Sequence, residues 1–175
     1  MRVARSAMVL TMLFIGFLIQ SAWLSLLNFP VVIPPLVVVV AAAFCLRREP
    51  LNAALIGFSA GIILDFFPPS TTPLGVSSVS LVLIFFFVNQ VRPLIEGSLI
   101  LPVVAVALVP SAYLFLNTLT RILLSQQTLS ITELLADFVM LSLYGLILAT
   151  FVLPVTQWLD RLFAPRNAIS VSRIR

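Results

Sequence analysis

The chain reads GFSAGIILDFFPPSTTPLG over residues 57–75, and this stretch says most about the fold. It places an acidic residue, Asp65, inside an apolar run, and a turn and a second apolar run follow directly. Counting along a helix, Ala54, Gly57, Gly61 and Asp65 share one face. The two glycines are four residues apart, and this small-xxx-small spacing lets a second helix approach closely. We therefore expect a tightly packed helix pair, with Asp65 facing protein rather than lipid.

The composition indicates a membrane protein. Hydrophobic residues make up 61% of the 175 residues and charged residues 9%, against about half and a quarter in soluble domains. A soluble chain of this length has too little interior for that much apolar surface, so the expected solvent is a bilayer. The single cysteine excludes an intrachain disulfide, and the absence of His and Lys excludes imidazole metal sites and Schiff-base chemistry.

Breaks between the apolar runs predict an all-α integral membrane protein, a six-transmembrane-helix bundle. Every run must be helical, because unpaired backbone groups are costly in lipid. We expect one membrane domain over residues 7–160, a cytoplasmic N-terminus over 1–6 and a basic cytoplasmic tail over 161–175. The predicted spans are Ala7–Leu27, Val31–Leu46, Leu51–Phe67, Leu74–Val91, Leu99–Thr120 and Ile131–Trp158.

The arginines predict the orientation. If there are six spans, only Arg121 falls on one side, and excess arginine marks the cytoplasmic side. Both termini are then cytoplasmic, and the tail binds anionic lipids or docks a cytosolic partner. The net charge of +4 does not indicate nucleic acid, because the arginines lie in short loops and tails. The other nine are Arg2, Arg5, Arg47, Arg48, Arg92, Arg161, Arg166, Arg173 and Arg175.

Two roles are open for Asp65. Thr72 is a good N-cap and Pro73 suits the first position of the next helix, whose free amides and dipole would bind a carboxylate at the same level. In this interpretation Asp65 is structural. Acidic residues inside a membrane also mark ligand, ion or partner sites, so a binding role is the alternative.

Further polar groups lie in the predicted outer half. Tyr113, Asn117 and Arg121 recur every four residues and share a helix face. The segment from Ser130 to Glu133 matches a capping box, so Glu133 is expected to cap its own helix. Asp137 lies deeper, and Arg121 is the only basic residue predicted on that side. We hypothesise an Arg121–Asp137 ion pair, with Glu133 as the competing partner.

The outer-half groups allow two interpretations. Gln20, Asp65, Tyr113, Asn117 and Asp137 either line a shallow outward-facing pocket or hold the bundle together by interhelical hydrogen bonds of about 0.6 kcal/mol each. No serine has a nearby base, and the sequence contains no HExxH, P-loop or GxSxG motif. We therefore predict no catalytic, cofactor-binding or metal-binding residue, and no enzymatic activity.

The stretch over residues 57–75 resembles the family of the bacterial rod shape-determining protein MreD. Members of that family carry a Gly-x-x-x-Gly-x-x-x-Asp helix, a turn, and Pro-Leu-Gly opening the next helix. The length, number of predicted spans and charge bias are also compatible with that family. The matching positions here are Gly57, Gly61, Asp65, Pro73, Leu74 and Gly75.

The resemblance implies an inner-membrane scaffold of the cell-wall elongation machinery, which maintains rod shape by binding MreC and organising peptidoglycan synthesis. The filament protein MreB, the glycosyltransferase RodA and a class B penicillin-binding transpeptidase are further implied partners. MreD-like proteins also resemble the substrate-binding subunits of energy-coupling-factor transporters. The alternative function is therefore a small-molecule-binding transporter subunit. The sequence leaves open which helix binds MreC and whether the chain forms a homodimer.

Overall fold

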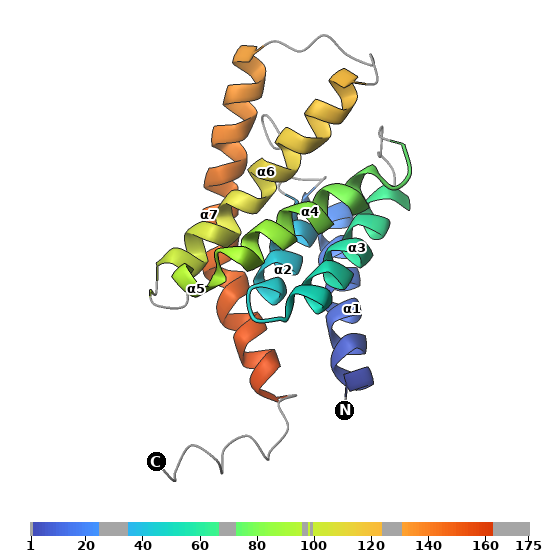
Figure 1. The fold of residues 1–175 in the computed structure, drawn as a ribbon, viewed down its shortest axis with the longest axis vertical. Coiled ribbons are helices and arrows are strands. Elements are labelled where there is room, and N and C mark those ends of the chain that lie inside the picture. The colour runs from blue at the N-terminus through green and yellow to red at the C-terminus, as the bar shows by residue number, and fades with distance from the viewer. Residues whose placement is uncertain are drawn as a thin grey trace.

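The computed structural model describes residues 2–24, 35–66, 73–95, 98, 100–123 and 131–162. Within these ranges all regular structure is helical and no strand occurs, which confirms the all-α prediction (Figure 1). The elements are α1 (Arg2–Ile19), a π-helical continuation η1 (Gln20–Leu24), α2 (Leu36–Cys45), α3 (Pro50–Phe66), α4 (Val76–Gln90), α5 (Arg92–Ile95), α6 (Leu101–Leu123) and α7 (Ile131–Leu162).

Helix α2 forms the centre of the bundle. It contacts α1, α3, α4, α6 and α7, and nearly all of its residues are buried. Its sequence LVVVVAAAFC has no polar face, and a helix that is apolar all round belongs in a core. Its three consecutive alanines are all buried. The remaining helices are arranged around it, with α3 against α4 and α6 against α7 as the most extensive pairs.

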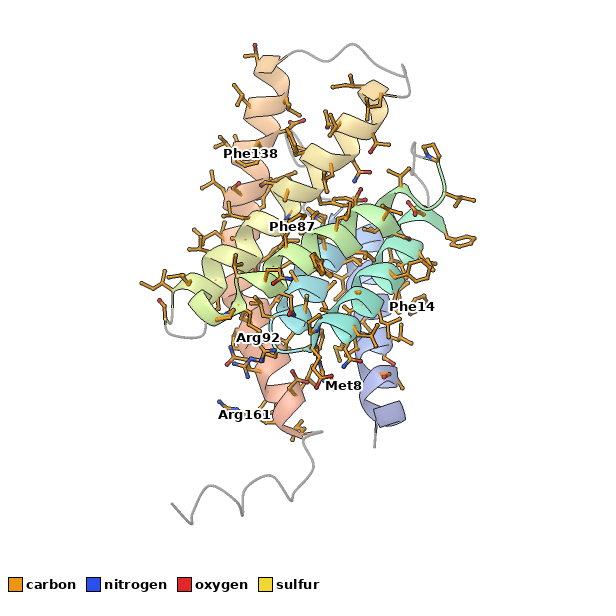
Figure 2. The ribbon with its side chains drawn as sticks, in the orientation of Figure 1. Met8, Phe14, Phe87, Arg92, Phe138 and Arg161 are labelled. Atoms are coloured by element: carbon orange, nitrogen blue, oxygen red, sulfur yellow. The ribbon has the colours of Figure 1, made fainter. Side chains whose placement is uncertain are left out.

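Two of the described helices are long and apolar enough to cross a membrane, over Leu101–Thr120 and Leu134–Leu162. The other apolar helices are shorter, at 10–17 residues each. Large apolar side chains are exposed on α1, α3, α4, α6 and α7, including Leu51 on α3 and Phe151 on α7. Phe14 on α1 and Phe87 on α4 are two further examples (Figure 2). The bundle therefore has an apolar exterior as well as an apolar core.

The observed boundaries correct the expected ones in several places. Helix α2 begins at Leu36 and not at the expected Val31, because Pro35 is not helical and lacks the N–H that a helix interior needs. Helix α1 begins at Arg2, so the segment expected as a separate N-terminus is helical from there on. Helix α7 continues to Leu162, four residues past the expected end at Trp158. Helix α5 was not predicted. It follows because Pro93 has no N–H and cannot continue the hydrogen-bond ladder of α4, but suits the first turn of a new helix.

The two ends of the bundle differ in the elements they carry. The start of α1, the turn between α2 and α3, the junction of α4 with α5, and the end of α7 lie toward the same end (Figure 1). Arg92 and Arg161 lie toward this end in Figure 2. The end of α6 and the start of α7 lie at the opposite end (Figure 1). We call the first of these the basic end.

Candidate functional site

The glycines of α3 lie in close contact with α4. A Cβ on Gly57 would lie 2.8 Å from Cδ2 of Phe85 and 3.1 Å from the carbonyl oxygen of Leu81. A Cβ on Gly61 would overlap the backbone of Ser78. The predicted small-xxx-small contact is therefore present, and its partner is α4, the next helix in the chain.

Asp65 lies at the end of this contact and binds the start of α4. Its Oδ2 accepts hydrogen bonds from the backbone N–H of Gly75 at 2.8 Å and from the hydroxyl of Ser78 at 3.4 Å. Its Oδ1 accepts from the backbone N–H of Ser77 at 3.3 Å. Only 4% of the residue is exposed. The carboxylate thus satisfies amides that the helix leaves free and lies at the positive end of its dipole. These hydrogen bonds are the ones that the structural interpretation of Asp65 predicts.

The expected start of α4 was wrong by three residues. Pro73 is not the first helical residue, because the helix begins at Val76 with Gly75 as its N-cap. Gly75 has φ of 95°, a left-handed conformation that favours glycine, and a Cβ there would meet nothing within 4 Å. Glycine is therefore required for its backbone and not for space. Asp65 caps the helix from another element, while Thr72 lies outside the described residues.

The motif residues thus divide into two groups. Gly57, Gly61, Asp65 and Gly75 meet in the contact between α3 and α4, which we call the α3–α4 clamp. Pro73 and Leu74 are exposed in the turn before α4 and take no part in its hydrogen bonds to Asp65. The carbonyl of Pro73 accepts a hydrogen bond from Val76 N–H at 3.3 Å, which closes that turn.

Tyr113 connects α6 to the clamp. Its hydroxyl donates to Oγ of Ser77 at 2.8 Å, next to the amide that binds Asp65. One turn further along, Asn117 is buried and its Nδ2 donates to the carbonyl of Tyr113 at 3.2 Å. Its Oδ1 is also buried and accepts no hydrogen bond from a described residue. Arg121 belongs to the last turn of α6, but its side chain lies outside the described residues.

Gln20 has a local structural role that the sequence did not reveal. It lies in η1, and its Oε1 accepts a hydrogen bond from the backbone N–H of Val37 at 3.1 Å. Val37 belongs to the first turn of α2, and Pro35, the N-cap residue of this helix, makes no side-chain capping hydrogen bond. The π-helical turn places the side-chain amide of Gln20 opposite α2. The turn has no sequence signal, and neither does the pairing of Gln20 with a residue so far along the chain.

Helices α6 and α7 make contact through small residues. The hydroxyls of Ser111 and Ser142 are 2.7 Å apart, and Ser111 also donates to the carbonyl of Phe138 at 3.2 Å. A Cβ on Gly145 would overlap the carbonyl of Ala107. These residues show the i, i+3 and i+4 spacing of a small-residue seam, a signal that was available in the sequence.

The predicted acidic partners of Arg121 are placed only in part. Asp137 is half-buried on α7. The side chain of Glu133 and residue Ser130 lie outside the described part of the chain, as does the Arg121 side chain. The hypothesised Arg121–Asp137 pair and the capping box therefore stay predictions.

A buried ion pair lies at the basic end. Nη2 of Arg48 is 2.7 Å from Oδ1 of Asp160, and the side chains are 10% and 8% exposed. The carbonyl of Arg48 accepts from Nδ2 of Asn89 at 2.9 Å and from Nη1 of Arg92 at 3.2 Å. One turn residue thus links α4, α5 and α7. The sequence predicts Arg48 only as a topology signal, because its partner is 112 positions away.

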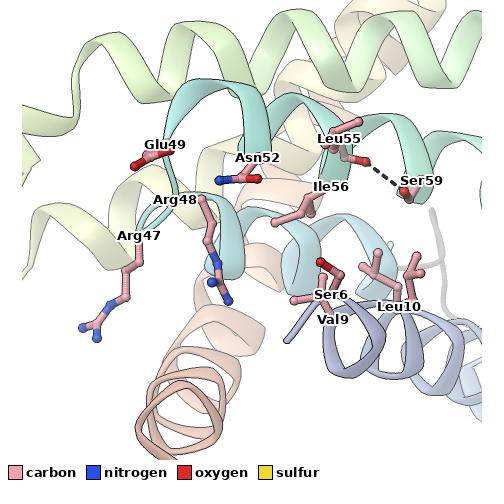
Figure 3. A pocket seen from close by; sticks show the side chains of 11 residues that line it. Ser6, Val9, Leu10, Arg47, Arg48, Glu49, Asn52, Leu55, Ile56 and Ser59 are labelled. Carbon is pink, nitrogen blue, oxygen red and sulfur yellow. Dashed lines mark hydrogen bonds between the residues drawn. The ribbon is translucent and has the colours of Figure 1, made fainter. Parts of the chain in front are cut away.

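A cavity of about 550 Å³ opens between α1 and α3, also toward the basic end (Figure 3). None of the five outer-half groups lines it, so it is not the outward-facing pocket of the alternative interpretation. Within the described ranges, no group of three His, Cys, Asp or Glu residues could hold a metal ion. The lining residues are Ser6, Val9, Leu10, Leu13, Arg47, Arg48, Glu49, Asn52, Leu55, Ile56 and Ser59.

No family model, curated protein or solved structure matches this chain.

The geometry of the polar groups favours a structural role, in which they hold helices together, over a catalytic or ligand-binding role. Asp65, Tyr113, Gln20 and Arg48 each use their side chain to bind a neighbouring helix or helix end. Such bonds set the position of one helix against the next and leave these groups occupied. The described residues therefore form a bundle whose internal polar contacts hold its helices in register.

Proposed function

We propose that this chain is a six-span inner-membrane scaffold of the bacterial cell-wall elongation machinery, related to MreD. The observation that carries the proposal is the α3–α4 clamp. Four of the six residues that carry the resemblance meet in one contact and together hold α3 against α4. They are Gly57, Gly61, Asp65 and Gly75. A motif whose residues act together is better support than the same letters scattered through a fold.

The apolar exterior supports insertion of the whole bundle in the membrane. Phe87 and Phe151 are 66% and 69% exposed, and a soluble monomer seldom exposes such residues on every side. Helices α3 and α4 have 17 and 15 residues, which span about 26 and 23 Å. They are short for a hydrocarbon core of about 30 Å, and a locally thinned bilayer accommodates such helices at modest cost.

The arginines support a cytoplasmic position for the basic end. In this orientation the α3–α4 clamp lies toward the outer leaflet, where a buried carboxylate costs less than at the bilayer centre. The basic end then faces the MreB filament. The outer faces of the helices are free to pack against the single span of MreC, and RodA and the transpeptidase assemble through that complex.

The scaffold role works by rigidity in this proposal. A partner helix in lipid gains no hydrophobic driving force from association, so it depends on shape complementarity and small contact residues. The clamp, the Ser111–Ser142 seam and the Arg48–Asp160 pair keep the helix faces at fixed positions. A fixed surface binds a partner without first losing conformational entropy.

Photocrosslinking in living cells tests the proposal. The chain replaces the resident MreD of a rod-shaped bacterium and carries a photoreactive residue at one exposed position per helix, namely Phe14, Leu51, Phe87, Phe115 or Phe151. We expect rod shape to be retained and MreC to be captured from one face only. Samples without illumination, and cells whose MreC lacks its span, are the controls. If every position is at normal abundance and none captures a wall-synthesis protein, the scaffold function is wrong.

One observation favours the alternative, a small-molecule-binding transporter subunit. Oδ1 of Asn117 is a buried acceptor to which no described residue donates, and such groups are often completed by a ligand or water. Native mass spectrometry of the purified chain would then show a bound small molecule that Asn117→Leu releases. Tyr113→Phe is the matched control, because that hydroxyl is already bonded to Ser77.

A further inference from the structure

We propose that the cavity between α1 and α3 is a site for one anionic phospholipid of the cytoplasmic leaflet. The inference rests on the proposed membrane location but not on any role in wall synthesis. In Figure 3, Leu55, Ile56 and Ser59 of α3 face Ser6, Val9 and Leu10 of α1 across a groove. We call this space the α1–α3 groove.

The lining of the groove changes from charged to apolar along its length. Arg47, Arg48 and Glu49 lie at one end, in the turn before α3. Leu55 and Ile56 lie further along α3, away from that turn. The hydroxyl of Ser59 donates to the carbonyl of Leu55 at 2.8 Å, so it adds no unsatisfied polar group to the apolar end. A ligand that fits must be ionic at one end and apolar at the other.

The length of the groove matches one leaflet. Glu49, the residue before α3, and Ser59 on α3 mark its two ends, and the helix rises about 14 Å from Pro50 to Ser59. That is close to half of a hydrocarbon core of about 30 Å. With the basic end at the cytoplasmic surface, the apolar part therefore reaches from headgroup level to about the middle of the bilayer, which is the depth of an acyl chain.

The volume of the groove suits a small amphipathic ligand. It holds about 550 Å³, within the range of about 300–1,000 Å³ that is typical of small-molecule sites. A chain of methylenes is thin enough to enter, and the exposed side chains of Leu10 and Leu55 would cover it.

The charge at the open end favours an anionic headgroup. Arg47 is exposed and forms no ion pair with any described residue. The guanidinium of Arg48 is already paired with Asp160, which keeps it in place beside the groove. The lining holds two arginines, Arg47 and Arg48, and one acidic residue, Glu49, and guanidinium groups bind phosphate well.

Native mass spectrometry of the full chain in mild detergent tests the site. Phosphatidylglycerol and phosphatidylcholine are titrated separately, and inorganic phosphate is added as a competitor. We expect one phosphatidylglycerol to be retained, with phosphatidylcholine bound more weakly and free phosphate unable to displace it. Arg47→Gln should weaken phosphatidylglycerol binding about five-fold, the equivalent of one arginine near an anionic surface. Leu55→Trp, which fills the apolar part, should reduce retention of both lipids.

Arg161→Gln is the matched control, because Arg161 is exposed at the same end but does not line the groove. Helicity by circular dichroism shows that each variant is folded. Equal retention of the two lipids, or unchanged binding in Arg47→Gln, would overturn the proposal. Displacement by phosphate would indicate a simple anion site, and a dimer that forms only without lipid would assign the groove to a second copy. Because no wall-synthesis protein is present, a negative result here leaves the scaffold function untouched.

Discussion

Substitution of Asp65 tests the α3–α4 clamp most directly. The carboxylate accepts two backbone amides and one hydroxyl, at 2.8, 3.3 and 3.4 Å. Asp65→Leu has as many side-chain heavy atoms and removes all three bonds, so the part-buried amide of Gly75 and the buried amide of Ser77 lose this acceptor. Loss of a helix cap costs about 1–2 kcal/mol, and loss of a charge at a partly buried helix end costs up to about 2 kcal/mol. We expect Asp65→Leu to lower the free energy of unfolding by about 3 kcal/mol.

Asp65→Asn separates hydrogen bonding from charge. The amide oxygen can still accept the short bond from Gly75 N–H, whereas the charge–dipole attraction is lost. We expect a loss of about 1 kcal/mol, within the range given for charges at helix ends. The measurement is unfolding of the purified chain from mild detergent into increasing SDS, followed by circular dichroism.

The control for Asp65 is a local cap elsewhere in the chain. Oγ of Ser98 accepts from the backbone N–H groups of Ile100 and Leu101, in an exposed position at the start of α6. Ser98→Ala should cost about 1 kcal/mol or less. If Asp65→Asn and Asp65→Leu cost the same, or if Asp65→Leu costs no more than Ser98→Ala, then Asp65 does not hold α4 by capping it.

Three further substitutions test the other contacts. Gly61→Ala should destabilise the fold by about 1–3 kcal/mol, because its Cβ overlaps α4; Gly16→Ala is the control, since its Cβ would meet Val40 at an ordinary 3.7 Å, and equal effects would contradict the close approach. Tyr113→Phe removes one interhelical hydrogen bond and should cost about 0.6 kcal/mol in the same SDS assay; no change beyond error would show that this bond adds no stability. Arg48→Gln removes the buried ion pair with Asp160 and should cost about 3–5 kcal/mol, whereas Asp160→Asn with Arg48→Gln should recover part of this loss, measured as a double-mutant cycle.

The parts of the fold that were predictable depend on short spacings. The clamp was predictable because three residues four apart must share a helix face, and because the turn returns the chain beside that same face. It was also predictable that Asp65 caps α4, since a free helix N-terminus attracts a carboxylate. The residue at which α4 starts was not predictable, because Gly75 needs no side-chain cap of its own once Asp65 accepts a hydrogen bond from its amide.

The remaining contacts depend on packing between distant segments. Gln20 meets Val37 only because η1 turns the amide toward α2, and a π-helical turn has no clear signature in these residues. Arg48 meets Asp160 only after α2 and α7 have packed together. Nothing in a single sequence favours this acid over Glu96 or Glu49. From the sequence, Arg48 was predicted only as a topology signal, and its contacts with other helices were not predicted.

The ends of the bundle differ in a way that bears on how it is used. Toward the clamp, Asp65, Tyr113 and Gln20 are bonded to neighbouring helices, so a ligand that needs these groups must first break contacts that hold the fold. At the basic end, the ion pair of Arg48 fixes the helices while an adjacent groove stays open and Arg47 stays exposed. A scaffold needs this combination, because a rigid interior keeps its lipid-facing surfaces constant while its exchangeable contacts lie at the membrane surface. A transporter subunit needs the opposite, with weakly bonded polar groups where the substrate enters. The distribution of bonded and unbonded groups therefore favours the scaffold, and Asn117 is the one described residue that argues for the alternative.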